Sequence, residues 1–309
     1  MLTTRTAVVI NPVSANGSTG KKWPEIAASL KRNGISFVHR FTDFPGHATD
    51  ITSSYLRDGH DLIIAVGGDG TFNEVVNGFF EENGKPINSG AALGLVSGGT
   101  GRDFIRTLGI PTDHDEAVRH IAVSGLRPVD LGKITYVNCE GVPEKRYFIN
   151  VAGLGLDGAT AERVNRTSKA LGGFISFLWA TIATIVLYRN QRMNIVVDGK
   201  QICDEPITVV VFGNGRYFGS GMCIAPNALV DDGLLDIVIL RDLSKLNLLV
   251  SLPRVYKGTH LSHPRVTSLR GEKIVVASDG NALLDLDGEQ PGRAPVEIEI
   301  MPHAINLRG

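Results

Sequence analysis

Cysteine, long apolar runs and a surplus of either charge are all scarce in this chain. Three cysteines occur in 309 residues (Cys139, Cys203 and Cys223), an odd number without the spacing of a metal site. This usage argues against a disulfide-stabilised secreted protein and predicts a reduced, cytosolic compartment. The formal net charge is −1, so bulk attraction to nucleic acid is not supported and we expect no nucleic-acid partner.

The longest apolar stretch, Phe174–Tyr188, is shorter than the roughly 20 residues that a membrane-spanning helix needs, so we expect no transmembrane segment. We predict instead a helix that is mostly buried. Its flanks carry basic residues at Arg163, Arg166, Lys169, Arg189 and Arg192. Cationic ends beside an apolar segment also favour transient, peripheral contact with the anionic inner leaflet of a membrane.

Several catalytic signatures are missing as well. The eight histidines show no HExxH spacing and the chain has no G-x-S-x-G elbow, which excludes the metalloprotease and α/β-hydrolase classes that these motifs mark. The loop after the first strand is not a Walker A loop, because Ala15 stands where its first glycine belongs.

A length of 309 residues predicts two domains. Strand-like segments at Ala7–Ile10, Ser36–Phe41, Leu62–Val66 and Ala92–Val96 alternate over residues 1–128 with helix-like segments at Pro24–Arg32, Ala48–Arg57 and Arg102–Leu108. These repeated units predict an α/β fold with a doubly wound parallel sheet, whose ligands bind beyond the carboxyl ends of the strands.

Residues 129–301 have a different pattern, in which short β-rich runs dominate. The expected strands are Lys133–Asn138, Tyr147–Val151, Met193–Val197, Ile207–Phe212, Leu235–Leu240, Lys273–Ala277 and Val296–Ile300. Helical patterns at 169–189 and 243–257 interrupt them, and Asp198-Gly199 and Asn214-Gly215 are hairpin signals. This half predicts a mainly antiparallel β-sandwich domain.

The most informative stretch follows the third strand. Gly67-Gly68-Asp69-Gly70 ends it, and apolar residues at helical spacing (Phe72, Val75, Val76 and Phe79) begin directly afterwards. A strand, a glycine turn and a helix start together present backbone N–H groups to phosphate. The alternative is a tight turn in which Asp69 is a local cap. Polar loops at 11–17 and 97–101 fall on the same sheet edge, which favours a nucleotide site.

Two acidic segments stand out in the second half. Asp231, Asp232 and Asp236 surround a glycine turn, which indicates either a divalent-cation site or a solvated hairpin turn. Asp285 and Asp287 alternate with leucines before Gly288, and Glu289 follows that glycine, an arrangement that suits a general base or a plain hairpin tip.

The combined motifs resemble the diacylglycerol-kinase catalytic-domain family, whose superfamily also contains NAD kinases and 6-phosphofructokinases. The resemblance is carried, in order, by Asn11-Pro12-x-Ser14, Gly67-Gly68-Asp69-Gly70-Thr71-x-Asn73-Glu74-Val75, Gly99-Thr100-Gly101-x-Asp103-Phe104, Phe212-Gly213-Asn214-Gly215-Arg216, Pro226-Asn227-Ala228-x-x-Asp231-Asp232-Gly233-x-Leu235-Asp236 and Leu286-Asp287-Gly288-Glu289.

The resemblance implies a bacterial lipid kinase with a nucleotide-binding domain at 1–128, to which the last segment 302–309 returns, and a lipid- and metal-binding β-sandwich domain at 129–301. It implies catalytic roles for Asp69 and for Glu289, the latter as the proton acceptor. ATP is expected to contact Asn11, Thr42, Gly68, Asp69, Gly70, Thr71, Phe72, Asn73, Glu74 and Thr100. Mg²⁺ is expected at the Asp232 carboxylate and the carbonyls of Leu229 and Leu234.

This chain departs from the family pattern P-x-G-T-x-N-D at two positions, where Ser97 replaces proline and Arg102 replaces asparagine. The function implied is transfer of the ATP γ-phosphate to a hydroxyl of diacylglycerol or a related lipid at a membrane surface. The alternatives are an NAD kinase-like enzyme, although its GSTAY-like motif is absent, and a catalytically inactive nucleotide-binding regulatory protein. Monomer and homodimer both remain open.

Overall fold

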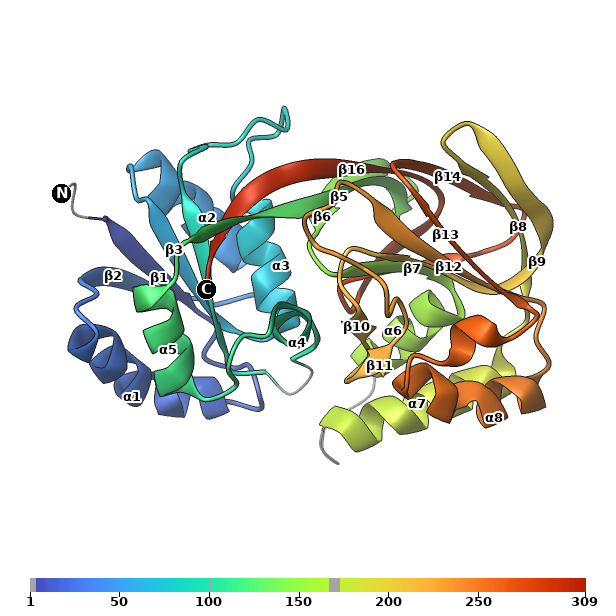
Figure 1. The fold of residues 1–309 in the computed structure, drawn as a ribbon, viewed down its shortest axis with the longest axis horizontal. Coiled ribbons are helices and arrows are strands. Elements are labelled where there is room, and N and C mark those ends of the chain that lie inside the picture. Colours follow the sequence, from blue (N-terminus) through green and yellow to red (C-terminus); the bar gives the residue numbers. More distant parts are fainter. Residues whose placement is uncertain (1–3, 100–101, 167–172) are drawn as a thin grey trace. The chain divides into compact units, whose positions relative to one another are not determined.

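The computed structural model describes residues 4–99, 102–166 and 173–309 (Figure 1). The chain divides into two compact units. Residues Met1–Val129 and His303–Gly309 form the first unit, and Asp130–Pro302 form the second. Strands β5 (Leu126–Asn138) and β16 (Glu289–Arg308) each contain residues of both units. No helix among the described residues has the length and apolar character needed to cross a bilayer.

The first unit is built on strands that pair in parallel. Its elements are β1 (Thr6–Ile10), α1 (Ser18–Arg32), β2 (Phe37–Phe41), α2 (His47–Arg57), β3 (Leu62–Gly67), α3 (Asp69–Asn77), β4 (Ala92–Ser97), α4 (Asp103–Leu108) and α5 (His114–Val123). The order across the sheet is β2-β1-β3-β4, with the end of β16 beside β4. Because every neighbour is parallel, the loops that follow β1, β3 and β4 share one edge.

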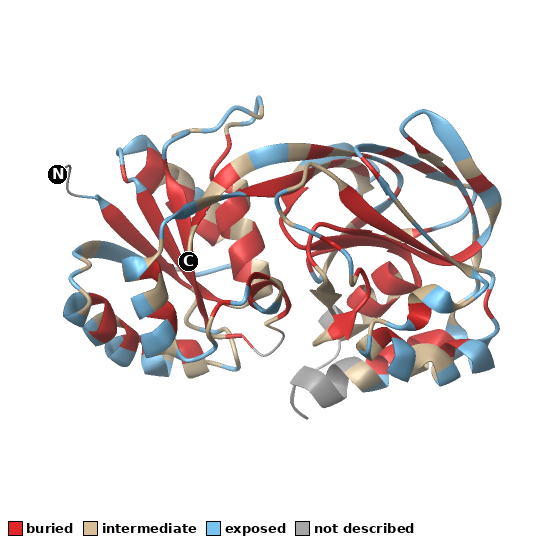
Figure 2. Cartoon of the chain, in the orientation of Figure 1, coloured by how far each residue is buried: buried red, intermediate tan, exposed pale blue. Residues whose placement is uncertain are grey.

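Burial explains why these strands have continuous apolar sequences. Strands β1, β3 and β4 are buried along their whole length (Figure 2), as expected for a parallel sheet covered on its faces. Helix α1 contacts α5 and helix α2 contacts α3. Helix α1 begins earlier than the expected Pro24, at Ser18, because Gly17 in the left-handed conformation (φ 81°) turns the chain into it.

The second unit is antiparallel. Its strands after β5 are β6 (Pro143–Phe148), β7 (Val151–Gly155), β8 (Gln191–Val197), β9 (Lys200–Gly213), β10 (Tyr217–Phe218), β11 (Met222–Cys223), β12 (Leu235–Arg241), β13 (Val266–Gly271), β14 (Lys273–Ser278), β15 (Leu283–Leu286) and β16. Its helices are α6 (Leu156–Arg166), α7 (Gly173–Leu187), α8 (Lys245–Tyr256) and the 3₁₀ turn η2 (His260–Ser262).

Two apolar clusters hold this unit together. One gathers the inward-facing residues of the strands, including Tyr136, Phe148 and Phe212. The other lies on the opposite face of β9 and β12 and includes Ile185 of α7 and Leu248 of α8. The expected mixed α/β architecture with a β-sandwich-like second half is therefore confirmed.

Two sequence expectations in this unit were wrong. Asn214-Gly215 is no hairpin tip: Asn214 is fully buried, and its Nδ2 donates to the carbonyls of Asp130 (2.9 Å) and Ile149 (2.7 Å). The helix expected at 169–189 is confirmed as α7, but the expectation of only one helix between β7 and β8 was wrong, because helix α6 also lies there. In contrast, Asp198-Gly199 does form the expected turn between β8 and β9, with φ 49° and 77°.

Candidate functional site

The glycine turn after β3 is as tight as its sequence indicates. A Cβ on Gly67 would lie 2.5 Å from Oγ1 of Thr71, so no larger residue fits there. The carbonyl of Gly67 accepts hydrogen bonds from the N–H groups of Gly98 (2.7 Å) and Gly99 (3.2 Å). The turn is thus bonded directly to the loop that follows β4.

Three polar loops meet at this edge of the sheet. From the loop after β1, Asn11 Nδ2 donates to Thr71 Oγ1 at 3.0 Å. A Cβ on Gly99 would stand 2.7 Å from the Cα of Gly68, and one on Gly98 would stand 2.0 Å from Oγ1 of Thr19. Glycine is required at Gly99 because two backbones touch and at Gly98 because the Thr19 side chain lies against it, so the three loops form a compact glycine-lined edge.

Asp69 connects two of these loops rather than capping its own helix. Its carboxylate accepts hydrogen bonds from the N–H groups of Asp103 and Phe104, both at 3.3 Å, at the start of α4. Burial raises the pKa of Asp69, while these backbone donors oppose the rise. Asp69 as a residue is partly exposed at the glycine turn, while its carboxylate is desolvated against the start of α4.

The remaining residues expected at the nucleotide differ in accessibility. Thr71 and Asn73 are buried, and the side chain of Phe72 is fully buried in the core. Glu74 accepts a hydrogen bond from the N–H of Ala48 at 3.1 Å, which satisfies a free donor at the start of α2. Gly68, Gly70 and Thr42 are partly exposed. Thr100 lies outside the described residues.

The two departures from the family pattern have clear places in the structure. Ser97 is buried at the end of β4, and its carbonyl contacts Nε2 of His114 at 3.0 Å. Arg102 has φ 57° and donates through Nε to the carbonyl of Gly99 at 3.2 Å. Arg102 therefore takes a left-handed conformation that asparagine adopts more easily, and it brings a guanidinium to the loop after β4.

In the second unit, Asp287 organises the turn between β15 and β16. Its carboxylate accepts three backbone hydrogen bonds, from Ile149 (3.0 Å), Asn150 (3.1 Å) and Val151 (2.8 Å). Asp287 has φ 50°, a conformation in which aspartate is tolerated better than most residues. The buried carboxylate joins the β6–β7 junction to the turn, and this turn carries Glu289.

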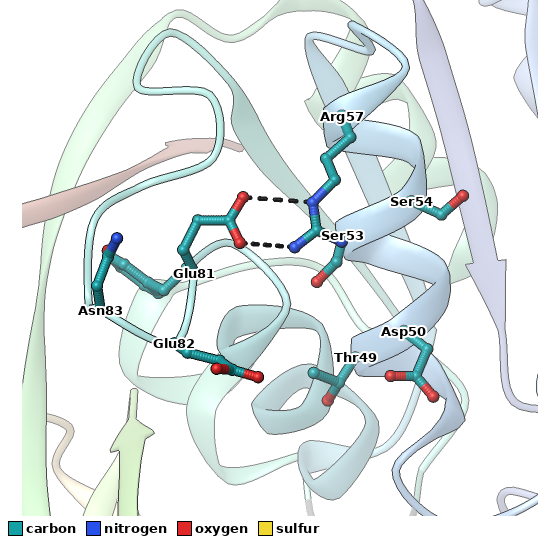
Figure 3. A pocket seen from close by; sticks show the side chains of 9 residues that line it. Thr49, Asp50, Ser53, Ser54, Arg57, Glu81, Glu82 and Asn83 are labelled. Atoms are coloured by element: carbon teal, nitrogen blue, oxygen red, sulfur yellow. Dashed lines mark hydrogen bonds and ion pairs between the residues drawn. The ribbon is translucent and has the colours of Figure 1, made fainter.

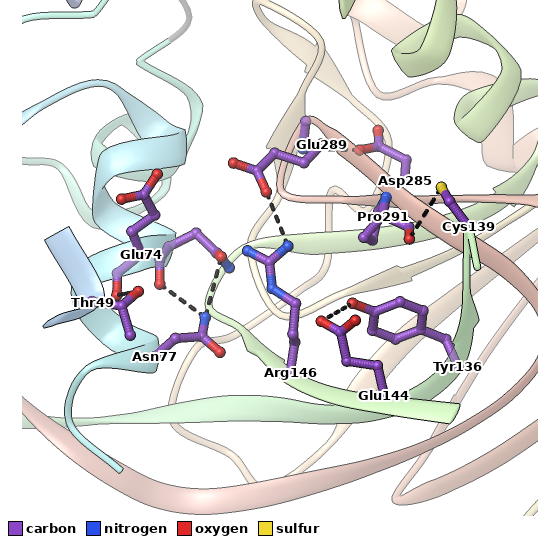
Figure 4. A network of polar contacts seen from close by, with 12 residues as sticks. Thr49, Glu74, Asn77, Tyr136, Cys139, Glu144, Arg146, Asp285, Glu289 and Pro291 are labelled. Carbon is purple, nitrogen blue, oxygen red and sulfur yellow. Dashed lines mark hydrogen bonds and ion pairs between the residues drawn. The ribbon is translucent and has the colours of Figure 1, made fainter. Parts of the chain in front are cut away.

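Glu289 is partly exposed and ion-paired. Its Oε2 lies 3.0 Å from Nη1 of Arg146 on β6 (Figure 4). Beside it, the hydroxyl of Tyr136 donates to Oε1 of Glu144 at 2.7 Å. Burial alone would lower the pKa of Arg146, but the carboxylate of Glu289 is among the groups that raise it overall. The guanidinium therefore stays charged and holds Glu289 at the turn.

A second acidic group beneath this turn was missed by the sequence analysis. Asp157 of α6 and Asp285 of β15 are buried and hydrogen-bonded to each other, and Asp285 also accepts from the N–H of Gly288 at 2.8 Å. Burial raises the pKa of Asp157 to about 7, and it raises that of Asp285 well above its usual value. Two buried carboxyls that are hydrogen-bonded to each other titrate as a pair. Asp157 belongs to no acidic cluster in the sequence, so no local signal marks it.

The acidic turn at 227–236 holds a guanidinium. Asp232 pairs through Oδ2 with Arg270 and accepts from the N–H of Leu234 through Oδ1 (3.2 Å). Asp236 pairs with the same arginine at 3.1 Å. Both oxygens of Asp232 are thus engaged by donors, and the arrangement does not fit Mg²⁺ unless Arg270 moves away. Mg²⁺ bound by Leu229, Asp232 and Leu234 stays a prediction from the resemblance.

A polar surface hollow on the first unit lies between α2 and the segment 80–83 (Figure 3). Arg57 and Glu81 face each other across it, with Nη2 and Oε2 2.6 Å apart. None of the candidate site residues lines the hollow, and this ion pair neutralises its charges, so we assign it no part in the site.

Two family models match the chain. Residues 5–134 match the diacylglycerol kinase catalytic domain, and residues 150–309 match the YegS C-terminal NAD kinase beta sandwich-like domain. A diacylglycerol kinase of Mycobacterium tuberculosis is 30% identical over 305 residues, which cover 98% of this chain and 94% of that protein. One of Bacillus subtilis is 27% identical over 294 residues, covering 95% and 92%.

Solved structures agree with these matches. A putative diacylglycerol kinase from Bacillus anthracis superposes with a TM-score of 0.77 at 26% identity, covering 98% of this chain and 97% of that one. Yeast NADH kinase, complexed with NADH, superposes with a TM-score of 0.52 at 11% identity, covering 98% and 82%. The second likeness shows a shared fold alone.

Proposed function

The chain belongs to the diacylglycerol kinase catalytic-domain family, and from this premise we propose that it transfers the γ-phosphate of ATP to a hydroxyl of diacylglycerol or a related lipid. The product is phosphatidic acid or an analogous lipid phosphate. The observation that carries the proposal is the junction of the glycine loops after β3 and β4, which the Asp69 carboxylate ties together. In this proposal the glycines at the shared edge let the phosphates approach the loop backbones closely.

We assign nucleotide binding to the first unit, as a doubly wound domain whose two helix pairs cover opposite faces. The backbone of Gly68–Asn73 cradles the phosphates, while Asn11 and Glu74 hold the surrounding loops in place. Phe72 contributes through its backbone, because its side chain is buried. ATP acts as its magnesium complex, and the metal supplies charge neutralisation on the phosphates when bound. Asp69 holds the start of α4 against the glycine turn and so positions the loop backbones around this complex.

Glu289 accepts the proton of the lipid hydroxyl in this proposal. Arg146 pairs with Oε2, which leaves Oε1 to receive the proton as the hydroxyl oxygen attacks the γ-phosphorus. Asp287 positions Glu289 without touching the substrate, since its own carboxylate is filled by three N–H groups. The second unit thus takes the lipid.

The test is transfer of labelled γ-phosphate from ATP to a panel of lipid extracts, with NAD as a competing acceptor. Glu289→Gln keeps the shape but removes the base, so kcat falls at least 100-fold while KM for ATP changes little. Glu297→Gln, on the exposed side of the same strand, is the matched control and keeps full turnover.

Asp69→Asn abolishes turnover in the same assay, whereas Asp58→Asn at the exposed end of α2 does not. Transfer to NAD without transfer to lipid would overturn the proposal. Turnover at the wild-type rate in Glu289→Gln would remove Glu289 from the mechanism.

A further inference from the structure

Helices α7 and α8 expose more apolar surface than a solvated helix pair needs. Trp179 and Leu187 on α7 are 70% and 64% exposed, and Leu246 and Val250 on α8 are 70% and 66% exposed. The two helices pack against each other, and Lys245 of α8 donates to the carbonyl of Val186 on α7. The four side chains therefore belong to two joined helices of one unit.

The exposed apolar side chains are separate from those with which the two helices pack into the core of the unit. Ile185 of α7 is 2% exposed, and Leu248 and Val255 of α8 are each 8% exposed; all three pack into the apolar cluster on β9 and β12. The expectation that the apolar stretch is mostly buried holds for Ile185 and fails for Trp179 and Leu187. Each helix is apolar on the side that packs into the unit and also on the side that is exposed to solvent. Packing within the unit explains the first set of side chains but not the second.

The sequence segments that contain these helices carry charge of a single sign. Residues 163–197 and 243–271 contain no aspartate or glutamate, although 32 acidic residues occur in the chain, and each segment contains five arginines or lysines. Of these, Arg192 is paired with Asp204, and Arg270 is paired with Asp232 and Asp236. Arg189, Arg254 and Lys257 are exposed at or beside the helix ends. Asp242 stands at the border, hydrogen-bonded to Asn190 at 2.5 Å. Lys169, which the sequence analysis also placed at this flank, lies outside the described residues.

We propose that the α7–α8 face docks on an anionic lipid bilayer, with Trp179, Leu187, Leu246 and Val250 entering the boundary between head groups and acyl chains. Apolar side chains rimmed by cations match an interface that is apolar inside and negative at its surface. A second copy of this chain fits less well, because it would bring another cationic face against this one. The choice of lipid as occupant rests on the proposed function, whereas the docking itself does not require turnover.

The experiment uses Trp179 as its own reporter. The chain has two tryptophans, and Trp23 is buried in the first unit, so Trp23→Phe leaves Trp179 as the single tryptophan, which is excited selectively over the tyrosines. Vesicles of phosphatidylcholine alone are compared with vesicles containing 10, 20 and 40% phosphatidylglycerol. We expect binding to rise at least tenfold over this series. We also expect the Trp179 emission to shift to shorter wavelength and to be quenched by lipids brominated near the head group.

Variants distinguish docking through this face from nonspecific adsorption to lipid. Leu246→Glu/Val250→Glu lowers vesicle binding at least tenfold, and Arg254→Glu/Lys257→Glu removes its dependence on anionic lipid. Val123→Glu, at an equally exposed valine of the first unit, leaves binding unchanged. Sedimentation of the chain with both tryptophans repeats the measurement in case Trp23→Phe disturbs the first unit. Circular dichroism confirms that each variant is folded.

Several results would overturn the proposal. Vesicle binding that ignores the Leu246→Glu/Val250→Glu change, an emission spectrum of Trp179 that never shifts, or wild-type protein that stays unbound at every lipid composition would each do so. A dimer that this double variant dissociates, with vesicle binding intact, would assign the face to a second copy. Because binding is measured without ATP, failure of the proposed kinase reaction leaves this result unaffected.

Discussion

Removal of the Asp287 carboxylate should destabilise the second unit strongly, although the residue lies on a short turn. Asp287 is 9% exposed, and the three residues whose N–H groups it accepts, Ile149, Asn150 and Val151, are each at most 5% exposed. Asp287→Ala leaves all three donors without their acceptor in a place that water reaches poorly.

The magnitude follows from these contacts. A buried donor left unsatisfied costs about 1–3 kcal/mol, so three of them cost about 3–6 kcal/mol if the turn admits some water. Alanine also loses about 1 kcal/mol at φ 50°, where aspartate and asparagine are tolerated. Asp287→Asn keeps that conformation and one acceptor oxygen, so we expect a loss of about 2 kcal/mol.

Urea denaturation followed by circular dichroism measures these losses through the unfolding midpoint. Asp279→Ala is the matched control, because this aspartate is exposed in the loop before β15, and we expect a change within about 0.5 kcal/mol. Hydrogen exchange of the peptide that contains Ile149 and Asn150 localises the effect. If Asp287→Ala unfolds within 1 kcal/mol of Asp279→Ala, and that peptide exchanges no faster, the three hydrogen bonds do not stabilise the turn.

Three further predictions concern other sites. The pKa of Asp157 is raised from its ordinary 3.8 to about 7, so its stability contribution is full below pH 3.8 and is lost as the pH rises through about 7. The melting temperature of Asp157→Asn therefore varies less between pH 5 and 8 than that of the wild type. Gly99→Ala forces a methyl group within 2.7 Å of Gly68 Cα, so calorimetry finds weaker ATP binding and a stability loss of about 1–3 kcal/mol; unchanged affinity would contradict this contact. Asp232→Ala removes one of the two carboxylates paired with Arg270 and lowers stability by about 1 kcal/mol equally in Mg²⁺ and in chelator. A loss seen only in Mg²⁺ would favour a metal at this turn.

The local periodicity of apolar residues in the sequence predicted much of the fold. The apolar run at Leu62–Val66 predicts a buried strand, and β3 is Leu62–Gly67, because a strand covered on both faces needs apolar residues at every position. Parallel pairing follows from alternation of strands and helices, and it places the loops after β1, β3 and β4 on one edge. The family was likewise evident from motifs that are each contiguous in the sequence.

Other features depend on partners that are distant in the chain. Asp69 meets N–H groups 34 and 35 residues away, and Asp287 meets those of residues 136 to 138 positions earlier. No spacing rule encodes such pairs, so Asp69 was weighed as a local cap and Asp287 as a hairpin tip. Asn214 was misjudged for the same reason, since only folding brings the carbonyls of Asp130 and Ile149 to its amide.

Composition and short-range sequence pattern thus determined the strands, the glycine turns and the family of this protein. They could do so because backbone conformation and burial impose a periodic pattern of apolar residues and glycines on neighbouring positions. Tertiary structure alone decided which carboxylates are free to act and which are held. Asp232 is paired with Arg270, Asp157 is buried against Asp285 with a raised pKa, and Glu289 stays partly exposed beside Arg146. Each state depends on a charge or a donor delivered from another element, and side-chain identity cannot reveal it before the chain has folded.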